Sequence, residues 1–347
     1  MWRKIDIHAH IVPKDWPDLH ARYGYGDFLR IEHYAPGRAR MVRRDGTVFR
    51  ELSENAWNPE RILEDMERHG VDAMVLSPVP VLFYYWARAR DGWEWSRFLN
   101  DHLAEVVARF PGRFLALGTV PLQDPELACR ELERCIRELG FPGVEIGTNV
   151  AGLELDDPRF APFFATAEAL GAAIFVHPWN MLGRERLQRY FLEWLVGMPA
   201  ETTLAICTFI FGGLFDRFPR LRVLFAHGGG SFAFTLGRIS RGYTARPDLC
   251  NVNNVADPRR YIGRFWVDAI THDPDALRYL LQVFGPERVL YGTDYPFPLG
   301  DLEHGRMLES LELAPETREL ILAHNAMEFL GLTADLRTTD ALHRTAS

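Results

Sequence analysis

The sequence predicts an α/β protein, a (β/α)8 TIM barrel with a lid insertion after strand 1. The first observation is that strand-like and helix-like segments alternate along the 347 residues, which is typical of parallel strands joined by helices. The second is that polar side chains able to bind a metal stand at the ends of four of the strands. Because the C-terminal ends of barrel strands converge on one face, we expect these side chains to meet there.

Eight apolar runs, separated by turn residues, predict the strands. They cover residues 4–10, 72–78, 114–120, 143–148, 172–177, 221–227, 265–270 and 288–293. Helical patterns between them cover residues 58–69, 94–109, 125–139, 158–170, 199–217, 273–285 and 316–330. The first of these helices has clear boundary signals, because Pro59 stands at its second position and Gly70 follows its end.

One long insertion separates the first strand from the first helix. Residues 11–57 contain an Asp45-Gly46 turn between two short runs, Ala39–Arg43 and Thr47–Leu52, a pattern that predicts a hairpin. An insertion at this point lies on the catalytic face, so we interpret it as a lid, with a solvated surface insertion as the alternative. Residues 1–332 are expected to form a single metal-dependent barrel domain, followed by a polar C-terminal tail at 333–347.

Composition limits the classes of partner. The net charge is −8 without a basic block, which argues against nucleic acid or an anionic membrane as the main partner. No apolar run approaches the roughly 18 residues of a membrane span, and the N-terminus lacks the features of a signal peptide. The four cysteines form no CxxC motif and are expected to be packing residues in a reducing compartment. We therefore expect a cytoplasmic protein.

A pair of histidines ends the first predicted strand. Strand side chains alternate between faces, so His8 and His10 point the same way, with Ala9 opposite. Further strands end in three other candidate ligands, His177, His227 and Asp294. Imidazole nitrogens with one carboxylate suit Zn²⁺, with water completing the shell.

Four histidines, one aspartate and water would crowd a five-coordinate ion, so one histidine is expected to act as a base. His227 is the best candidate, because Gly228 to Gly230 follow it and glycines allow close approach of substrate and backbone. A plain strand-to-helix turn is an equally good explanation of these glycines.

Three arginines indicate a substrate that carries carboxylates. Arg50 lies in the proposed lid, and Arg238 and Arg246 follow the His227 segment. Arginine pairs bidentately with carboxylates, although any one of them could instead form a surface ion pair. Four aromatic residues could form pocket walls or could fill the core: Trp179, Trp194, Tyr295 and Phe297.

Several longer strings resemble the decarboxylase branch of the amidohydrolase superfamily. They are Asp6–His10, Val48–Arg50, His177–Trp179, Trp194–Thr202, His227–Gly230 and Gly292–Gly300, and the likeness extends from residue 1 to about residue 332. The resemblance implies zinc-dependent, non-oxidative decarboxylation of 2-amino-3-carboxymuconate 6-semialdehyde to 2-aminomuconate 6-semialdehyde and CO2, without an organic cofactor, in tryptophan catabolism by the kynurenine pathway. A related decarboxylase of a hydroxybenzoate-like acid, or a lactone or cyclic amide hydrolase on the same metal site, remains an alternative.

The resemblance also assigns roles by position. The zinc ligands would be His8, His10, His177 and Asp294. His227 would be the catalytic base beside Asp294, and Arg50, Trp194 and Phe297 would contact substrate. Arg238 and Arg246 would reach the site of the neighbouring subunit in a homodimer. One zinc per subunit is expected, because binuclear relatives use a carbamylated lysine and no lysine follows Lys14.

Two positions depart from the pattern of these relatives. Asn180 stands where an aspartate usually follows His-Pro-Trp, and Arg44 stands where a lysine usually precedes the Asp-Gly turn. The first change removes a carboxylate near the expected pocket and could alter substrate preference, whereas the second keeps its charge.

Overall fold

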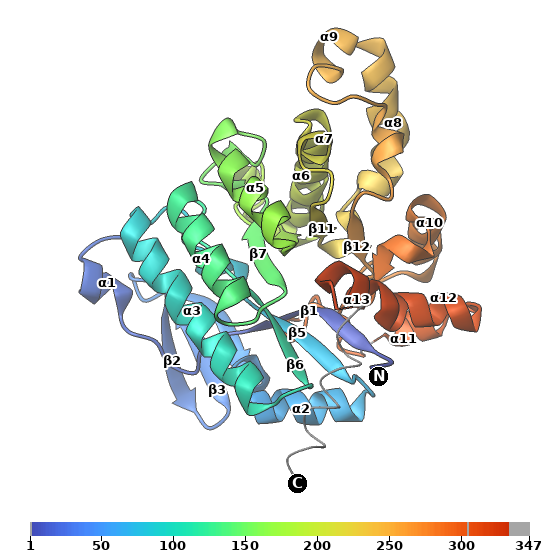
Figure 1. The fold of residues 1–347 in the computed structure, drawn as a ribbon. Coiled ribbons are helices and arrows are strands. Elements are labelled where there is room, and N and C mark those ends of the chain that lie inside the picture. The colour runs from blue at the N-terminus through green and yellow to red at the C-terminus, as the bar shows by residue number, and fades with distance from the viewer. Residues whose placement is uncertain (1, 304, 333–347) are drawn as a thin grey trace.

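The computed structural model describes residues 2–303 and 305–332 and confirms the predicted barrel. Eight strands are hydrogen-bonded in chain order, and every pair among them is parallel (Figure 1). The strands are β1 (Ile5–Ile11), β5 (Ala73–Pro78), β6 (Phe114–Gly118), β7 (Gly143–Gly147), β10 (Ala173–His177), β11 (Arg222–Phe225), β12 (Trp266–Asp268) and β13 (Val289–Leu290). The predicted tail, 333–347, lies outside the described residues.

The segment that follows β13 closes the barrel against β1. The backbone N–H of Ile7 donates to Tyr291 O at 3.0 Å, and that of His10 donates to Tyr295 O at 2.8 Å. Ala9 and Tyr295 form a parallel bridge. The last and first strand segments therefore meet, which brings the end of β13 beside the histidines of β1.

Helices cover the outside of the barrel, as predicted, with two differences among the larger helices. The larger ones are α2 (Pro59–Arg68), α3 (Ala89–Arg109), α4 (Pro125–Arg137), α5 (Ala161–Leu170), α6 (Met198–Phe211), α8 (Phe232–Ala245) and α10 (Pro274–Phe284). Shorter ones are α1 (Leu19–Tyr23), α7 (Leu214–Arg217), α9 (Pro247–Cys250), α11 (Arg306–Glu309), α12 (Pro315–Glu319) and α13 (Asn325–Leu330).

The first difference is that the single helix predicted at 199–217 is broken into α6 and α7. Gly213 has a left-handed φ of 70°, which ends the first helix and redirects the chain. The second is that α8 was missing from the predicted helices. Together with α9 it projects away from the barrel (Figure 1).

A β-bulge in β1 sets which side chains enter the barrel. The register with β5 shifts between Asp6 and Ala9, where β1 holds one extra residue. Ile5 and Ile7 pack with Phe175 and Leu224 inside the barrel. Ala9, beyond the bulge, belongs to the outer core under the helices. Without the extra residue, alternation from Ile7 would turn Ala9 inwards and both histidines outwards, so the bulge places His8 and His10 on the inside.

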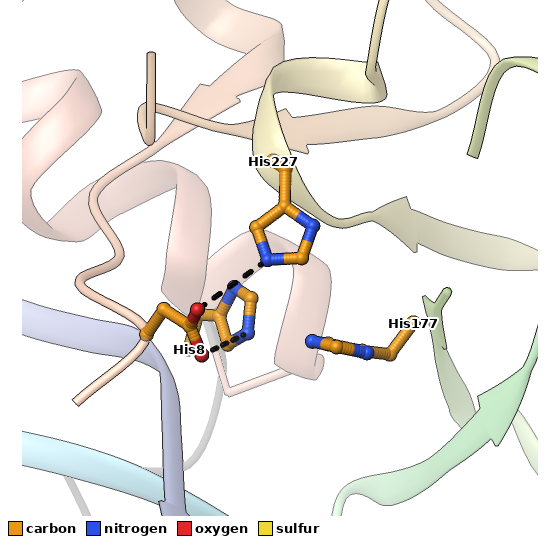
Figure 2. Close-up of side chains that lie close together, drawn as sticks. His8, His177 and His227 are labelled. Carbon is orange, nitrogen blue, oxygen red and sulfur yellow. Dashed lines mark ion pairs between the residues drawn. The ribbon is translucent and has the colours of Figure 1, made fainter. Parts of the chain in front are cut away.

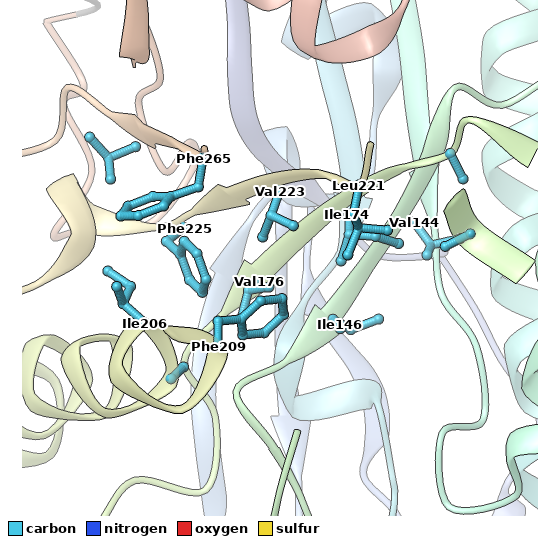
Figure 3. Close-up of a cluster of buried hydrophobic side chains, with 14 of the residues drawn as sticks. Val144, Ile146, Ile174, Val176, Ile206, Phe209, Leu221, Val223, Phe225 and Phe265 are labelled. Atoms are coloured by element: carbon cyan, nitrogen blue, oxygen red, sulfur yellow. The ribbon is translucent and has the colours of Figure 1, made fainter. Parts of the chain in front are cut away.

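The outer core joins the strands to the helices. Figure 3 shows Val176 of β10 and Phe225 of β11 packed towards Ile206 and Phe209 of α6. These residues alternate with interior ones along each strand, as the period of two requires. This packing fixes the strand ends that carry the site.

The sequence analysis expected no segment long enough for a membrane span, but one helix has that length. By length and composition alone, Glu193–Phe211 could cross a membrane, the only such helix among the described residues. It arises because a π-helical turn, Glu193–Gly197, runs directly into α6. The buried side chains of Ile206 and Phe209 pack on the barrel.

The insertion after β1 forms a three-stranded antiparallel sheet. The predicted hairpin is confirmed as β3 (Arg38–Val42) and β4 (Val48–Ser53), and β2 (Arg30–Ala35) adds a strand that was not predicted. Two further strands, β8 (Asn149–Val150) and β9 (Leu153–Glu154), form a small ribbon after β7. All four cysteines are free, as expected.

Candidate active site

Four histidines and one aspartate meet at the C-terminal ends of the barrel strands. Figure 2 shows the rings of His8, His177 and His227 directed towards a common point. His8 Nε2 lies 3.2 Å from His10 Nε2. The fold therefore brings together all five residues that the sequence singled out.

Asp294 lies among the four rings. Its Oδ1 is 3.5 Å from His8 Nε2 and 3.3 Å from His10 Nε2, and its Oδ2 is 3.6 Å from His227 Nε2. All of these side chains are largely buried, so their mutual interactions are screened little by water.

Backbone conformation aims two of the side chains. His227 has a φ of 55° and Asp294 a φ of 57°, in the left-handed region that non-glycine residues seldom occupy. Ala226 packs inside the barrel, so strict alternation would turn His227 outwards. The left-handed conformation instead turns its imidazole towards Asp294.

Asp268 supports the site from the end of β12. Its Oδ2 lies 2.8 Å from His8 Nδ1 and accepts the backbone N–H of His227 at 2.9 Å. Its Oδ1 accepts the N–H of Gly228 at 2.8 Å. Because this carboxylate binds His8 through Nδ1, it leaves Nε2 of that ring available as a ligand.

The electrostatics suit a cation. Burial lowers the pKa of His10, and lowers that of His177 well below its usual value, so both rings are neutral near pH 7. Burial raises the pKa of Asp294, but hydrogen bonds from His10 and His227 outweigh it and hold that pKa well below its usual range. Burial lowers the pKa of His227, but the Asp294 carboxylate outweighs burial and raises it. The site combines neutral nitrogen donors with an anionic oxygen.

The residues fit a divalent metal. Ligand atoms of His8, His177, His227 and Asp294 all lie within 4.8 Å of one another. His177 Nε2 is buried and has no hydrogen-bond partner. A buried nitrogen lone pair without a donor, facing a carboxylate and two further imidazoles, is what a metal ion would satisfy.

A cavity of about 370 Å³ opens above these residues. His10, His177, His227 and Asp294 form its polar floor. Its walls are mostly apolar: Val79, Val81, Trp179, Phe191, Trp194, Leu195, Met198, Ile270, Phe297 and Leu299. Trp194 stacks on Phe191 with ring centroids 4.8 Å apart, which makes one wall flat.

Arg50 enters this cavity from β4 of the lid sheet. Its guanidinium lies 4.3 Å from the ring centroid of Phe297. Among the described residues, no carboxylate forms an ion pair with it. Burial lowers the pKa of Arg50, and Asp294 offsets part of this effect, so the group keeps its charge near pH 7. It is therefore a charged donor available to a ligand.

Three residues named in the sequence analysis do not line the cavity of their own chain. Arg238 and Arg246 lie on α8 and at its C-terminal end and do not line it, and Arg246 instead pairs with Asp248 at 2.6 Å. Tyr295 fills the core, and its hydroxyl donates to Asp65 at 2.9 Å. Asn180 and Arg44, the two departures in the sequence, do not line the cavity either.

Sequence reasoning missed three groups at the site. Asp268 and Glu145 stand inside the barrel on strands that were predicted, and the signal that could have found them is an acidic residue within an apolar strand. Burial raises the pKa of Glu145 well above its usual value. His272, which had been assigned a structural role, lines the cavity.

Comparisons with known proteins agree with this geometry. A family model described as amidohydrolase matches residues 5–332. A curated 2-amino-3-carboxymuconate-6-semialdehyde decarboxylase from Dictyostelium discoideum is 53% identical over 330 residues, 95% of this chain and 92% of that protein. One of the same name from Caenorhabditis elegans is 37% identical, over 96% of both chains.

A solved structure shares the fold. It is a dihydroxybenzoic acid decarboxylase from Polaromonas sp. JS666 with bound manganese and an inhibitor, 2-nitroresorcinol. It is 25% identical, with a TM-score of 0.77 over 96% of this chain and 98% of that one. The site geometry and the similar proteins thus point in the same direction.

Proposed function

Because this chain belongs to the amidohydrolase family, we propose that it is a metal-dependent carboxy-lyase that converts 2-amino-3-carboxymuconate 6-semialdehyde into 2-aminomuconate 6-semialdehyde and CO2. One observation carries the proposal: the charged guanidinium of Arg50 shares a cavity with the buried group of histidines and Asp294. This combination suits a substrate that carries a carboxylate next to a reactive carbon. In this proposal the reaction belongs to tryptophan breakdown.

The cofactor in this proposal is one Zn²⁺ per subunit, held by His8, His10, His177 and Asp294. Three imidazoles and a carboxylate form a donor set that suits zinc. The alternative ion is manganese, which the Polaromonas enzyme binds. A cation bound there supplies Lewis acidity, which favours loss of a proton from water at neutral pH.

His227 is the base in this mechanism. Its Nε2 faces the Asp294 carboxylate, which stabilises the protonated ring, and its Nδ1 has no partner. His227 takes a proton from water as the oxygen adds to the conjugated carbon next to the one that bears the departing carboxylate. The proton then goes to the carbon that bears the carboxylate. The bond from this carbon to the carboxylate breaks, CO2 leaves, and the electron pair of that bond reforms the double bond as hydroxide departs from the adjacent carbon.

Arg50 holds a substrate carboxylate during these steps. Its planar guanidinium can donate two parallel hydrogen bonds, and the Phe297 ring beneath it fixes the plane. The flat wall of Phe191 and Trp194 suits a planar conjugated molecule. These contacts orient the scissile bond while the apolar walls limit access of bulk water.

A homodimer would supply the two missing arginines. In the proposed assembly, Arg238 and Arg246 reach the cavity of the neighbouring subunit rather than their own. Support comes from the projecting position of α8 and α9 (Figure 1) and from the exposed apolar side chains on and after them, which are Phe234, Leu249, Val252 and Val255. Exposed apolar groups of this size are typical of an interaction surface.

The test is decarboxylation of freshly generated 2-amino-3-carboxymuconate 6-semialdehyde by zinc-loaded protein. We expect loss of substrate absorbance together with release of one CO2, abolished by a chelator. A folded, zinc-replete protein that releases no CO2 would contradict the proposal.

The second candidate is a decarboxylase of a dihydroxybenzoate, favoured by the fold shared with the Polaromonas enzyme. The same CO2 assay with 2,6-dihydroxybenzoate separates the two, and hydrolysis of a lactone or cyclic amide would release no CO2.

A further inference from the structure

Glu145 is a buried acidic residue for which the proposed reaction has no use. It lies on β7 in register with Phe175 of β10, and since Phe175 packs inside the barrel, the Glu145 side chain points inwards as well. The residue is fully buried, and neither carboxyl oxygen has a hydrogen-bond partner. A buried carboxylate is unfavourable unless a donor or a cation compensates it.

Two imidazoles lie next to this carboxyl group. Glu145 Oε1 is 3.9 Å from His10 Nδ1, and ligand atoms of Glu145, His10 and His177 lie within 4.8 Å of one another. We call these three residues the inner group. The outer group is the zinc set proposed above, His8, His10, His177 and Asp294, whose ligand atoms lie beside one another.

His177 belongs to both groups and has one nitrogen to offer. Its Nδ1 lies 3.1 Å from Pro178 O, whereas its Nε2 has no partner. A single lone pair binds one cation at a time. The two groups are therefore alternative positions for one ion rather than a site for two.

The inner group differs from the outer one in chemistry. It has two imidazoles for one carboxylate, where the outer group has three imidazoles for one carboxylate. Pro78 O and Ser77 Oγ hold the His10 ring in place as hydrogen-bond partners of Nδ1, at 3.3 and 3.2 Å. Oxygen donors suit Mn²⁺, whereas imidazole-rich sets favour Zn²⁺.

We propose that Glu145 is a metal ligand, which with His10 and His177 forms an inner cation position that accepts Mn²⁺. This inference rests on the metal site proposed above and is independent of the substrate. With this second position, the barrel site can hold either Zn²⁺ or Mn²⁺, and Mn²⁺ uses the inner position.

The test is a titration of metal-free protein with Mn²⁺. Binding is measured as the decrease of the electron paramagnetic resonance signal of the free ion. Wild type and Glu145→Gln are compared, because glutamine keeps the volume and removes the charge. Glu131→Gln is the matched control, since Glu131 is also buried but lies on α4 beside Asn100 and Arg134. Zn²⁺ binding and thermal unfolding are measured on all three proteins.

We expect wild type and Glu131→Gln to bind one Mn²⁺ per chain, and Glu145→Gln to bind it at least about tenfold more weakly while retaining Zn²⁺. Equal Mn²⁺ affinity in wild type and Glu145→Gln would overturn the inner position, and two ions per chain would overturn the sharing of His177. Loss of Zn²⁺ binding by wild type would instead overturn the metal site of the proposed function.

A measurement on wild type keeps the inference testable if Glu145→Gln does not fold. Crystals soaked in Mn²⁺ are expected to show an anomalous peak within bonding distance of a Glu145 oxygen, His10 and His177. A peak bonded to the outer group, with no contact to Glu145, would overturn the proposal.

Discussion

The Asp268 carboxylate lies 2.8 Å from His8 Nδ1 and at the same time accepts the backbone N–H of His227 and of Gly228. One buried side chain thus links the ends of β1, β11 and β12. It fixes the tautomer of His8 and the strained backbone of His227. A residue outside the predicted site therefore holds two of its members in place.

Replacing Asp268 with asparagine should weaken metal binding. Both Asp268 oxygens accept N–H groups, so asparagine, which has one acceptor oxygen and no charge, must turn its NH2 group towards a donor. We therefore expect roughly 10- to 100-fold lower Zn²⁺ affinity, measured by competition with a chelator. Asp216→Asn is the control, because Asp216 accepts hydrogen bonds from Val255 and Tyr261 away from the site. Unchanged affinity in Asp268→Asn would show that this contact does not orient the ligand.

His227→Ala should keep its metal and lose turnover. Loss of a general base lowers kcat by roughly 100- to 10,000-fold. The measurement is kcat with substrate in excess, together with the zinc content of the same sample. A zinc-free variant would place His227 among the ligands, and near wild-type turnover would remove it from the role of base.

Arg50→Ala should lower kcat/KM by roughly 10- to 100-fold, since a charge-assisted hydrogen bond contributes about 1.5–3 kcal/mol. Arg50→Lys keeps the charge but not the bidentate geometry, so it should recover only part of the loss. Arg43→Ala serves as the control, because Arg43 directly follows β3 of the same lid sheet and pairs with Asp27. Equal losses in the two alanine variants would point to disruption of the lid rather than to substrate binding.

Mixing two inactive variants should restore activity if arginines cross the dimer interface. One variant carries His227→Ala and the other carries Arg238→Ala with Arg246→Ala. Random exchange of subunits makes half of the dimers mixed, and each mixed dimer has one intact site, so about a quarter of wild-type activity should return. No recovery from exchanged dimers would mean that these arginines act within their own subunit or not at all.

Protein stability should depend on His102 in mildly acidic solution. Burial lowers the pKa of this histidine from 6.5 to about 4. Between these values the unfolded chain binds the proton and the folded chain does not. The contribution of His102 to stability is therefore lost as the pH falls through this window, and this contribution does not change further below it. The charged groups that line the same depression are Lys14, Glu54, Glu60, Glu105 and Arg109.

The measurement is the free energy of unfolding of wild type and His102→Gln at pH 4.5 and pH 7. We expect the pH-dependent loss to be smaller in the variant by an amount on the order of 1–2 kcal/mol. The same slope in both proteins would assign the acid sensitivity to other groups.

Much of the fold and of the candidate site could be predicted from the sequence, because both depend on local patterns. Alternating apolar runs fixed the eight strands, and convergence of their ends then placed His8, His177 and Asp294 together. The helix at Phe232–Ala245 was missed, although Ser231 at its N-cap is a residue type that often starts a helix. The long apolar pattern at 199–217 hid the break that Gly213 imposes.

The amino-acid sequence by itself determined the barrel, the four histidines and the aspartate at its strand ends, and the likeness to amidohydrolase-type decarboxylases, since these follow from periodicity and from motifs. Only the tertiary structure decided that Asp268 supports His8, that Glu145 faces His10, and that Arg238 and Arg246 lie outside the cavity of their own chain. The reason is physical: contacts between residues more than 100 positions apart depend on strand register, a bulge and left-handed backbone turns, and none of these is visible in local patterning.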